Sequence, residues 1–310
     1  MYEIAHLTDL HIGPMHKLPL RAYFSKRFFG WLSWRRKRHA MHRVEVLESL
    51  LDDLAEHPAD HVAITGDMVN ISLQLEFENA ARWLGRFGTP DNASLVPGNH
   101  DAYVDGPYRD HWELWRRYMA DDGSEQISFP WVRRRGRIAF VGLSSAVPSP
   151  IAFAYGRLGE DQLAALEPVL RTLVDEELFT VILVHHPPLA RIHSRRNLRD
   201  HAALADVIRR CGGDLVLSGH QHRLELGSIA TQRGPVPVVV TPSASMDHPS
   251  HPEDGGYMRV RIDPDARRIG LRLRRYSAAT RRFDTAMQGE LVSRDGETQL
   301  VQGDWPDTVD

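Results

Sequence analysis

The sequence has a single cysteine, Cys211, and lacks any long run of apolar residues. One cysteine cannot form an internal disulfide, so the chain suits a reducing compartment. Cys211 precedes two glycines at the end of a helical pattern, where a packed thiol is expected rather than a nucleophile. The first residues, 2–7, have the pattern of a strand, and no charged leader precedes them. These absences predict a cytoplasmic protein without a signal peptide or a transmembrane helix.

The bulk composition is that of an ordinary globular protein. Of the 310 residues, 42% are hydrophobic and 25% are charged, and the formal net charge is −3. This composition argues against disorder, and the small net charge gives no general reason to expect a nucleic-acid partner. The sequence carries 17 histidines, and several of them stand at the ends of predicted strands. Their placement is therefore more informative than their number.

Strands and helices alternate along most of the chain, which predicts parallel strands covered by helices. The predicted strands of this part are 2–7, 61–64, 93–96, 131–133, 137–143, 179–184 and 214–217. The predicted helices are 44–54, 73–87, 108–119, 160–173 and 198–210. From Leu224 the pattern changes to strands alone, which predicts a second sheet packed against the first. We expect one domain over residues 1–290 and a polar, frayed tail over 291–310.

Metal-ligating side chains follow five of the predicted strands directly. They are Asp9 and His11, Asp67, Asn99 and His100, His185, and His220 with His222. Ligands bind at the carboxyl ends of strands in an open α/β sheet, so we expect these side chains at one edge. Carboxylate, imidazole and amide groups without a thiolate suit manganese, iron or zinc. The set is too large for one ion, and a central carboxylate such as Asp67 can bridge two.

Glycines stand directly before three of these ligands or ligand pairs, at Gly66, Gly98 and Gly219. A residue without a side chain lets two backbones, or a backbone and an ion, approach closely. The pattern predicts tight contacts between the loops at the ends of the strands.

These residues form five sequence blocks that resemble those of the calcineurin-like metallophosphoesterases. The blocks are Asp9-x-His11, Gly66-Asp67, Gly98-Asn99-His100-Asp101, His185-x-Pro187 and Gly219-His220-x-His222, in family order and with no ligand position substituted. The resemblance implies a four-layer α/β/β/α sandwich of two mixed sheets flanked by helices. It also implies a hydrolase of phosphoric esters with a binuclear centre of manganese, iron or zinc.

The resemblance assigns a role to each residue of the blocks. It gives the first metal Asp9, His11 and His222, the second metal Asn99, His185 and His220, and Asp67 to both. His100 would face the substrate and assist the leaving oxygen, and Asp101 would orient His100. His185 and His186 compete for one ligand position, which the family pattern gives to His185. His186 is then either a substrate-facing or a structural residue.

Within the family, compact chains with this Gly-Asn-His-Asp block resemble two kinds of enzyme. These are the class III cyclic-nucleotide phosphodiesterases and the UDP-2,3-diacylglucosamine pyrophosphatases. We expect a phosphodiesterase in which hydroxide activated by two metals attacks phosphorus and His100 assists the leaving group. One alternative is a membrane-associated pyrophosphatase of a nucleotide-linked lipid. An alternative of another class is a non-catalytic metal-binding scaffold, against which the complete ligand set argues.

Residues 17–43 form a basic, aromatic insertion after the first block. No acidic residue occurs between Asp9 and Glu45, and removing the nine Lys and Arg residues of this stretch from a net charge of −3 leaves −12. The aromatic residues could pack on the body of the protein. Alternatively, residues 21–38 could contact an anionic membrane, at the inner face if the protein is cytoplasmic. A third possibility is a phosphate-binding lid; nucleic acid is disfavoured because the remainder is acidic.

Four arginines follow the His185 block and offer a clamp for a substrate phosphate. They are Arg191, Arg195, Arg196 and Arg199. A solvated segment leading into the next helix is the alternative reading. With His186, Arg191 and Arg195 are the candidate substrate-binding residues, for a small or lipid-linked phosphate ester.

Overall fold

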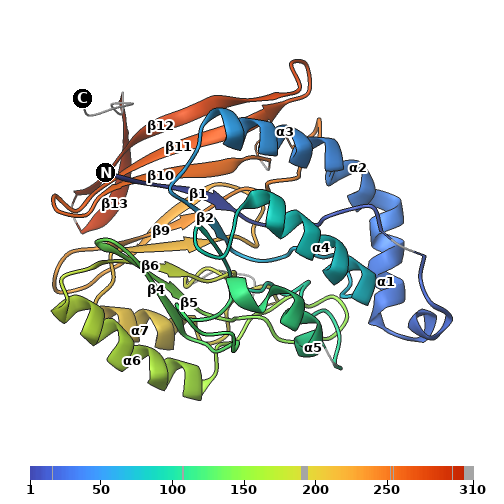
Figure 1. The fold of residues 1–310 in the computed structure, drawn as a ribbon, viewed down its shortest axis with the longest axis horizontal. Coiled ribbons are helices and arrows are strands. Elements are labelled where there is room, and N and C mark those ends of the chain that lie inside the picture. The colour runs from blue at the N-terminus through green and yellow to red at the C-terminus, as the bar shows by residue number, and fades with distance from the viewer. Residues whose placement is uncertain are drawn as a thin grey trace.

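The computed structural model describes residues 1–15, 17–106, 108–189, 195–251, 253, 255–294 and 296–303. Two β-sheets pack against each other, and helices cover their outer faces (Figure 1). Each sheet contains both parallel and antiparallel neighbours. The predicted four-layer α/β/β/α architecture is confirmed.

The seven-stranded sheet has the order β13-β12-β11-β10-β1-β2-β3. Its three parallel strands are β1 (Tyr2–Leu7), β2 (His61–Ile64) and β3 (Ala93–Leu95). The antiparallel strands are β10 (Tyr257–Asp263), β11 (Arg268–Ser277), β12 (Arg282–Arg294) and β13 (Glu297–Gln302). The ends of β1, β2 and β3 therefore point the same way, toward one edge of this sheet.

The six-stranded sheet has the order β4-β5-β6-β7-β9-β8. Its parallel strands are β5 (Ile138–Gly142), β6 (Phe179–Leu183), β7 (Leu215–Ser218) and β9 (Val236–Val240). The outer strands β4 (Trp131–Arg135) and β8 (Glu225–Ile229) pair antiparallel at its two sides.

Two helices cover each sheet. On the seven-stranded sheet they are α3 (Val44–Glu56) and α4 (Gln74–Phe87), and on the six-stranded sheet α6 (Glu160–Asp175) and α7 (His201–Cys211). The predicted helix over 108–119 is shorter, because α5 (Tyr108–Trp112) changes to a 3₁₀ turn, η3 (Glu113–Tyr118).

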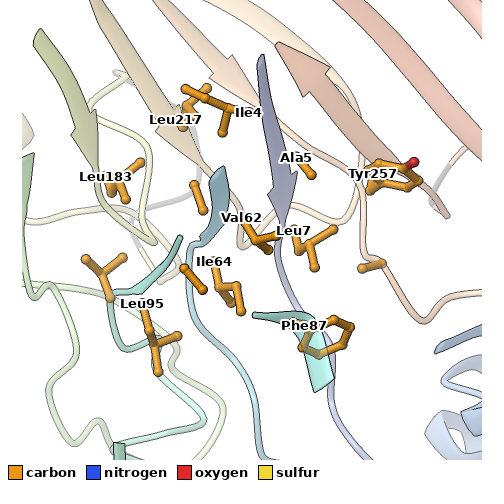
Figure 2. Packing of buried hydrophobic residues seen from close by; sticks show 14 of the residues in the cluster. Ile4, Ala5, Leu7, Val62, Ile64, Phe87, Leu95, Leu183, Leu217 and Tyr257 are labelled. Carbon is orange, nitrogen blue, oxygen red and sulfur yellow. The ribbon is translucent and has the colours of Figure 1, made fainter. Parts of the chain in front are cut away.

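Alternation along the strands divides the apolar side chains between two interfaces (Figure 2). Ile4 of β1 and Leu217 of β7 point toward each other and are fully buried in the same cluster. Ala5 and Leu7 point to the other side of β1, where Phe87 of α4 lies. Successive side chains of a strand point to opposite faces, so β1 contributes to both interfaces.

The expected boundary at residue 290 needs correction. β12 continues to Arg294 and pairs with β13 from Gly289↔Gln302 to Arg294↔Glu297. Leu291 is buried, and Leu300 packs against the same core. Few apolar residues stand in this edge ribbon, so the sequence suggested a polar tail. Residues 304–310 lie outside the described part of the chain.

The insertion is mostly helical, and its helix α1 is seen near one end of α4 (Figure 1). It comprises η1 (Leu20–Phe24), α1 (Lys26–Ser33), η2 (Trp34–Arg38) and α2 (His39–Met41). Leu18 and Ala22 are buried against Ile71 and Leu73 of the body, with Phe28 and Trp31 packed on the same cluster. Four large apolar residues stay exposed: Leu20, Tyr23, Phe24 and Phe29. One side of the insertion is thus packed structure, and the other faces outward.

The described helices include none with the length and apolar character needed to cross a membrane.

Candidate metal centre

The loops after β1, β2, β3, β6 and β7 meet at one edge of the two sheets. The backbone N–H of Asp9 donates to the carbonyl of Gly66, at 3.0 Å, within the seven-stranded sheet. The N–H of His220 donates to Asp9 Oδ2, at 2.8 Å, and joins the two sheets. These bonds place the five predicted blocks around one point.

Three side chains converge in the first half of the site. Asp9 Oδ1 lies 3.0 Å from His222 Nε2 and 4.0 Å from His11 Nε2. The other oxygen, Asp9 Oδ2, accepts hydrogen bonds from Thr8 and from His220, so Oδ1 alone faces the two imidazoles. The geometry presents one carboxylate oxygen and two ring nitrogens to a common point.

Asp67 lies between this half of the site and the second half. Its Oδ2 atom lies 3.8 Å from His11 Nε2 and 3.4 Å from His185 Nε2. His185 Nε2 in turn lies 3.2 Å from Asn99 Oδ1, and the rings of His185 and His220 are 5.1 Å apart. A single carboxylate oxygen therefore faces both sets of candidate ligands.

The backbone holds these ligands in an uncommon conformation. In the described chain, ten residues other than glycine have a positive φ, and five of them are Asp9 (52°), His11 (41°), Asp67 (55°), His220 (71°) and His222 (55°). Such conformations cost free energy and persist where the surroundings fix them, commonly at functional sites. Half of these strained positions thus carry candidate metal ligands.

Glycines allow the loops to approach as closely as the sequence predicted. A Cβ on Gly98 would lie 2.3 Å from Asp67 Oδ1, and one on Gly219 would lie 1.8 Å from Thr8 Oγ1. Gly66 has a φ of +84°, and a Cβ there would lie 2.4 Å from the nitrogen of Gly98. Side chains at these positions would displace the ligand loops themselves.

The hydrogen bonds of the histidines leave suitable atoms for a metal. His11 Nδ1 donates to the carbonyl of Val69 at 3.2 Å, and His185 Nδ1 donates to that of Thr65 at 2.6 Å. Each bond fixes the ring so that Nε2 faces the site, as in many metal-binding histidines. His220 Nε2 is buried and has no hydrogen-bond partner among the described residues. The donor set therefore fits a metal.

The electrostatics of the site also favour cations. Burial alone would lower the pKa of His185, but the neighbouring Asp67 carboxylate outweighs it and raises that pKa to about 9. Burial opposes ionisation of Asp67, yet His185 and His100 lower its pKa. Buried carboxylates are normally paired or bound to metals, so a bound cation would take the role that protonated imidazole otherwise plays.

Asp101 does not contact His100 as the resemblance implied, and this interpretation needs correction. Its carboxylate accepts from the backbone N–H groups of Asp67 (2.9 Å), Met68 (3.0 Å), Val69 (3.2 Å) and Gly98 (2.8 Å). His100 instead donates from Nδ1 to the carbonyl of Asn70, at 2.5 Å. Asp101 shapes the loop after β2, and that loop supplies the group that orients His100.

A second carboxylate, Glu76, completes this loop and was missed from the sequence. It accepts from the N–H groups of Asn70 (2.9 Å), Ile71 (3.2 Å) and Leu73 (2.9 Å). A glutamate at the third position of a helix commonly bonds back to the preceding backbone. Its position near the start of a predicted helix was the sequence signal that could have indicated these backbone bonds.

Two residues of the insertion reach the site and were also missed. Arg38 lies with Nη2 3.1 Å from His11 Nε2 and Nη1 3.2 Å from His100 Nε2. The His42 ring lies 4.4 Å from that of His11, and its Nδ1 is 2.9 Å from Ser245 Oγ. His11, His42 and His222 form one possible metal-binding group. The basic character of the segment, which suggested a phosphate-binding lid, was the signal that it could reach the site.

Of the candidate substrate-binding residues, His186 lies among the proposed ligands, with a ring nitrogen within 4.8 Å of nitrogens of His185 and His220. His186 is buried beside His220, with Nδ1 2.8 Å from Ser145 Oγ and Nε2 3.2 Å from the carbonyl of Ala154, so both ring nitrogens have partners. Arg195 lies over the ring of Phe153, at 5.4 Å. Arg191 lies outside the described residues.

Comparison with known proteins identifies the family of the chain. The model of the calcineurin-like phosphoesterase family matches residues 2–224. The chain therefore belongs to this family, as predicted.

A curated relative is described as a cAMP/cGMP dual specificity phosphodiesterase from Mycobacterium tuberculosis. It is 26% identical over 229 residues, which cover 71% of this chain and 62% of the relative. The chain thus spans less than two thirds of the length of that protein.

Solved structures with a similar fold include two phosphatases. A dimetal phosphatase from Danio rerio has a TM-score of 0.53 and 15% identity, covering 92% of this chain and 98% of that one. A purple acid phosphatase from yellow lupin has a TM-score of 0.56 and 12% identity, covering 88% of this chain and 51% of that one. At this identity the likeness shows the fold.

Proposed function

We propose that this protein is a two-metal phosphodiesterase in which two sets of ligands share Asp67. Asp9, His11 and His222 would hold one ion, Asn99, His185 and His220 the other, and Asp67 both. The observation that carries the proposal is the single oxygen, Asp67 Oδ2, 3.8 Å from His11 Nε2 and 3.4 Å from His185 Nε2. Two bound ions supply charge neutralisation for the phosphoryl oxygens and acidify the attacking water.

His100 is the proposed acid for the leaving group. Its Nδ1–H is held by the carbonyl of Asn70, so Nε2 is the nitrogen that faces the site. When the imidazole carries a second proton, Nε2–H donates it to the leaving oxygen as the bond from phosphorus to that oxygen breaks. The ring also stacks on Tyr103, with centroids 5.3 Å apart, which further limits its rotation.

Preference for a diester is supported by the curated relative, which is described as a cyclic-nucleotide phosphodiesterase. The test is a turnover panel with Mn²⁺ that compares bis-p-nitrophenyl phosphate, p-nitrophenyl phosphate, cyclic AMP and cyclic GMP. We expect hydrolysis of the diesters to exceed that of the monoester, to stop on chelation and to return with added Mn²⁺. Faster monoester hydrolysis would contradict the diester assignment, and undiminished turnover after chelation would contradict the metal assignment.

A second candidate function, action on a lipid-linked phosphate at a membrane, is favoured by the outer side of the insertion. Phe24 is 95% exposed and Leu20 is 86% exposed. The basic residues Arg21, Arg35, Arg36 and Lys37 are exposed in the same segment. Aromatic and aliphatic residues flanked by cations are typical of elements that bind anionic membrane surfaces.

Removing these two apolar side chains should release the protein from anionic vesicles. We expect Leu20→Ser with Phe24→Ser to weaken binding to phosphatidylglycerol vesicles at least about 10-fold, since each buried side chain contributes about 1.5–3 kcal/mol. Co-sedimentation measures this. The matched control is Leu114→Ser with Val301→Ser, which removes exposed apolar residues elsewhere. Equal pelleting of both double variants would exclude docking through the insertion.

A further inference from the structure

Arg38 is a cation that the insertion places inside the metal centre. It is the last residue of η2, and its carbonyl accepts the N–H of His42 at 2.9 Å. Its guanidinium lies between two residues of different roles, His11 on the ligand side and His100 on the leaving-group side. Arg38 therefore lies next to the space in which a phosphoryl group at the metal centre would be bound.

The partners of this guanidinium are unusual. Within the described chain, no carboxylate lies within ion-pair distance of Arg38, and its polar side-chain contacts are ring nitrogens of His11 and His100. His11 Nε2 has one lone pair, and in the proposed centre that lone pair binds the ion. The Nη2 donors would then need another acceptor, and an anionic oxygen of the substrate can provide it.

The insertion is anchored so that Arg38 keeps this position. Lys26 Nζ donates to the carbonyl of Ser149 at 2.8 Å, and Arg27 donates to the carbonyls of Ile71 (3.0 Å) and Ser72 (2.7 Å). Gly30 allows α1 to approach the body closely, because a Cβ there would lie 2.6 Å from Ile71 and from Tyr103. Two of the nine basic residues thus fix the segment, and Arg38 is aimed inward.

We propose that Arg38 is a phosphate-binding residue, whose guanidinium donates to a non-bridging oxygen of the phosphoryl group held at the metal centre. This inference rests on the proposed two-metal function and adds a substrate contact from outside the five sequence blocks. Arginine presents a planar fork of donors that matches two oxygens of one phosphate and stays charged at neutral pH. The insertion therefore acts as one wall of the active site.

The test compares Arg38→Ala, Arg38→Gln and Arg38→Lys with the control Arg209→Ala. Arg209 is exposed on α7, so its replacement removes the same charge without touching the site. Calorimetry measures binding of inorganic phosphate to each Mn²⁺-loaded protein, and elemental analysis measures its manganese. We expect Arg38→Ala and Arg38→Gln to weaken phosphate binding by about 10–100-fold with unchanged manganese. Arg38→Lys should be intermediate and Arg209→Ala unchanged.

Turnover of bis-p-nitrophenyl phosphate gives a second readout. The Arg38 variants should show a raised KM, and a lowered kcat if the contact strengthens in the transition state. If the wild type binds phosphate and both Arg38→Ala and Arg38→Gln bind it equally well, the inference is overturned while the metal function stands. If the wild type with Mn²⁺ neither binds phosphate nor hydrolyses any ester of the panel, the proposed function and this inference both fail.

Discussion

Replacing His100 with alanine is expected to lower kcat for bis-p-nitrophenyl phosphate by about 10²–10⁴-fold, the usual contribution of a positioned acid or base. The imidazole is held by the carbonyl of Asn70 and faces the site through Nε2, so its loss removes the proposed proton donor. Manganese content should stay at the wild-type level, because His100 is not among the proposed ligands. Steady-state kinetics and elemental analysis check the two parts.

A histidine elsewhere provides the control for this variant. His201 begins α7 on the outer face of the six-stranded sheet, and its Nδ1 donates to the nearby carbonyl of Leu198. His201→Ala should leave turnover unchanged. Wild-type turnover in His100→Ala would contradict the assignment of His100 as the acid. Loss of manganese in that variant would instead identify His100 as a ligand.

Replacing Asp67 with alanine is expected to have an effect of similar or greater size, because it acts on both halves of the centre. Losing the charge stabilisation supplied by a bound ion costs several kcal/mol in the transition state, or about 10³-fold in kcat. Asp67 Oδ1 also accepts the backbone N–H of His100 at 2.7 Å, so the acid would be displaced too. Turnover of the diester panel measures the loss.

Asp53 offers the comparison that separates this effect from unfolding. It is buried away from the site, where its carboxylate bonds to Arg274 and Tyr257. Breaking that cluster by Asp53→Ala removes one partner of a buried ion pair and destabilises the fold. If Asp67→Ala lost turnover only through unfolding, its melting temperature would fall as that of Asp53→Ala does, and the catalytic interpretation of Asp67 would be wrong.

The residues of the site that could be predicted are the metal-ligating ones that directly follow a strand. Asp9, Asp67 and His185 follow apolar strands. Parallel pairing of β1 and β2 brings Asp9 and Asp67 to one edge, and packing of the two sheets brings His185, which follows β6, beside them. Gly98 and Gly219 were predicted to allow the loops to approach closely, because a residue without a side chain leaves room beside a ligand.

The four-layer architecture followed from the family resemblance. The alternation of strand and helix predicted one parallel sheet up to His222 and a second sheet after it, and this division was wrong. In the structure β10 to β13 join β1, β2 and β3, and β4 to β9 form the other sheet.

The parts that could not be predicted depend on tertiary contacts. Arg38 reaches the metal centre because α1 docks on the body at Gly30, and nothing in a basic helical segment shows that one arginine points inward. Asp101 accepts from three backbone donors of the loop after β2 and from Gly98 in the loop after β3, an arrangement that depends on two loops folding together. β13 pairs with β12 through its backbone, so its polar side chains gave little pattern.

The central claim is that Asp67 joins two metal ions in one centre, and metal stoichiometry tests it most directly. Metal-free wild-type protein and Asp67→Ala are titrated with Mn²⁺ in a calorimeter. We predict two ions per wild-type chain, with diester turnover appearing as the second ion binds, and weakened binding at both positions in Asp67→Ala. One ion per fully active wild-type chain, or unaltered binding of two ions by Asp67→Ala, would contradict the account.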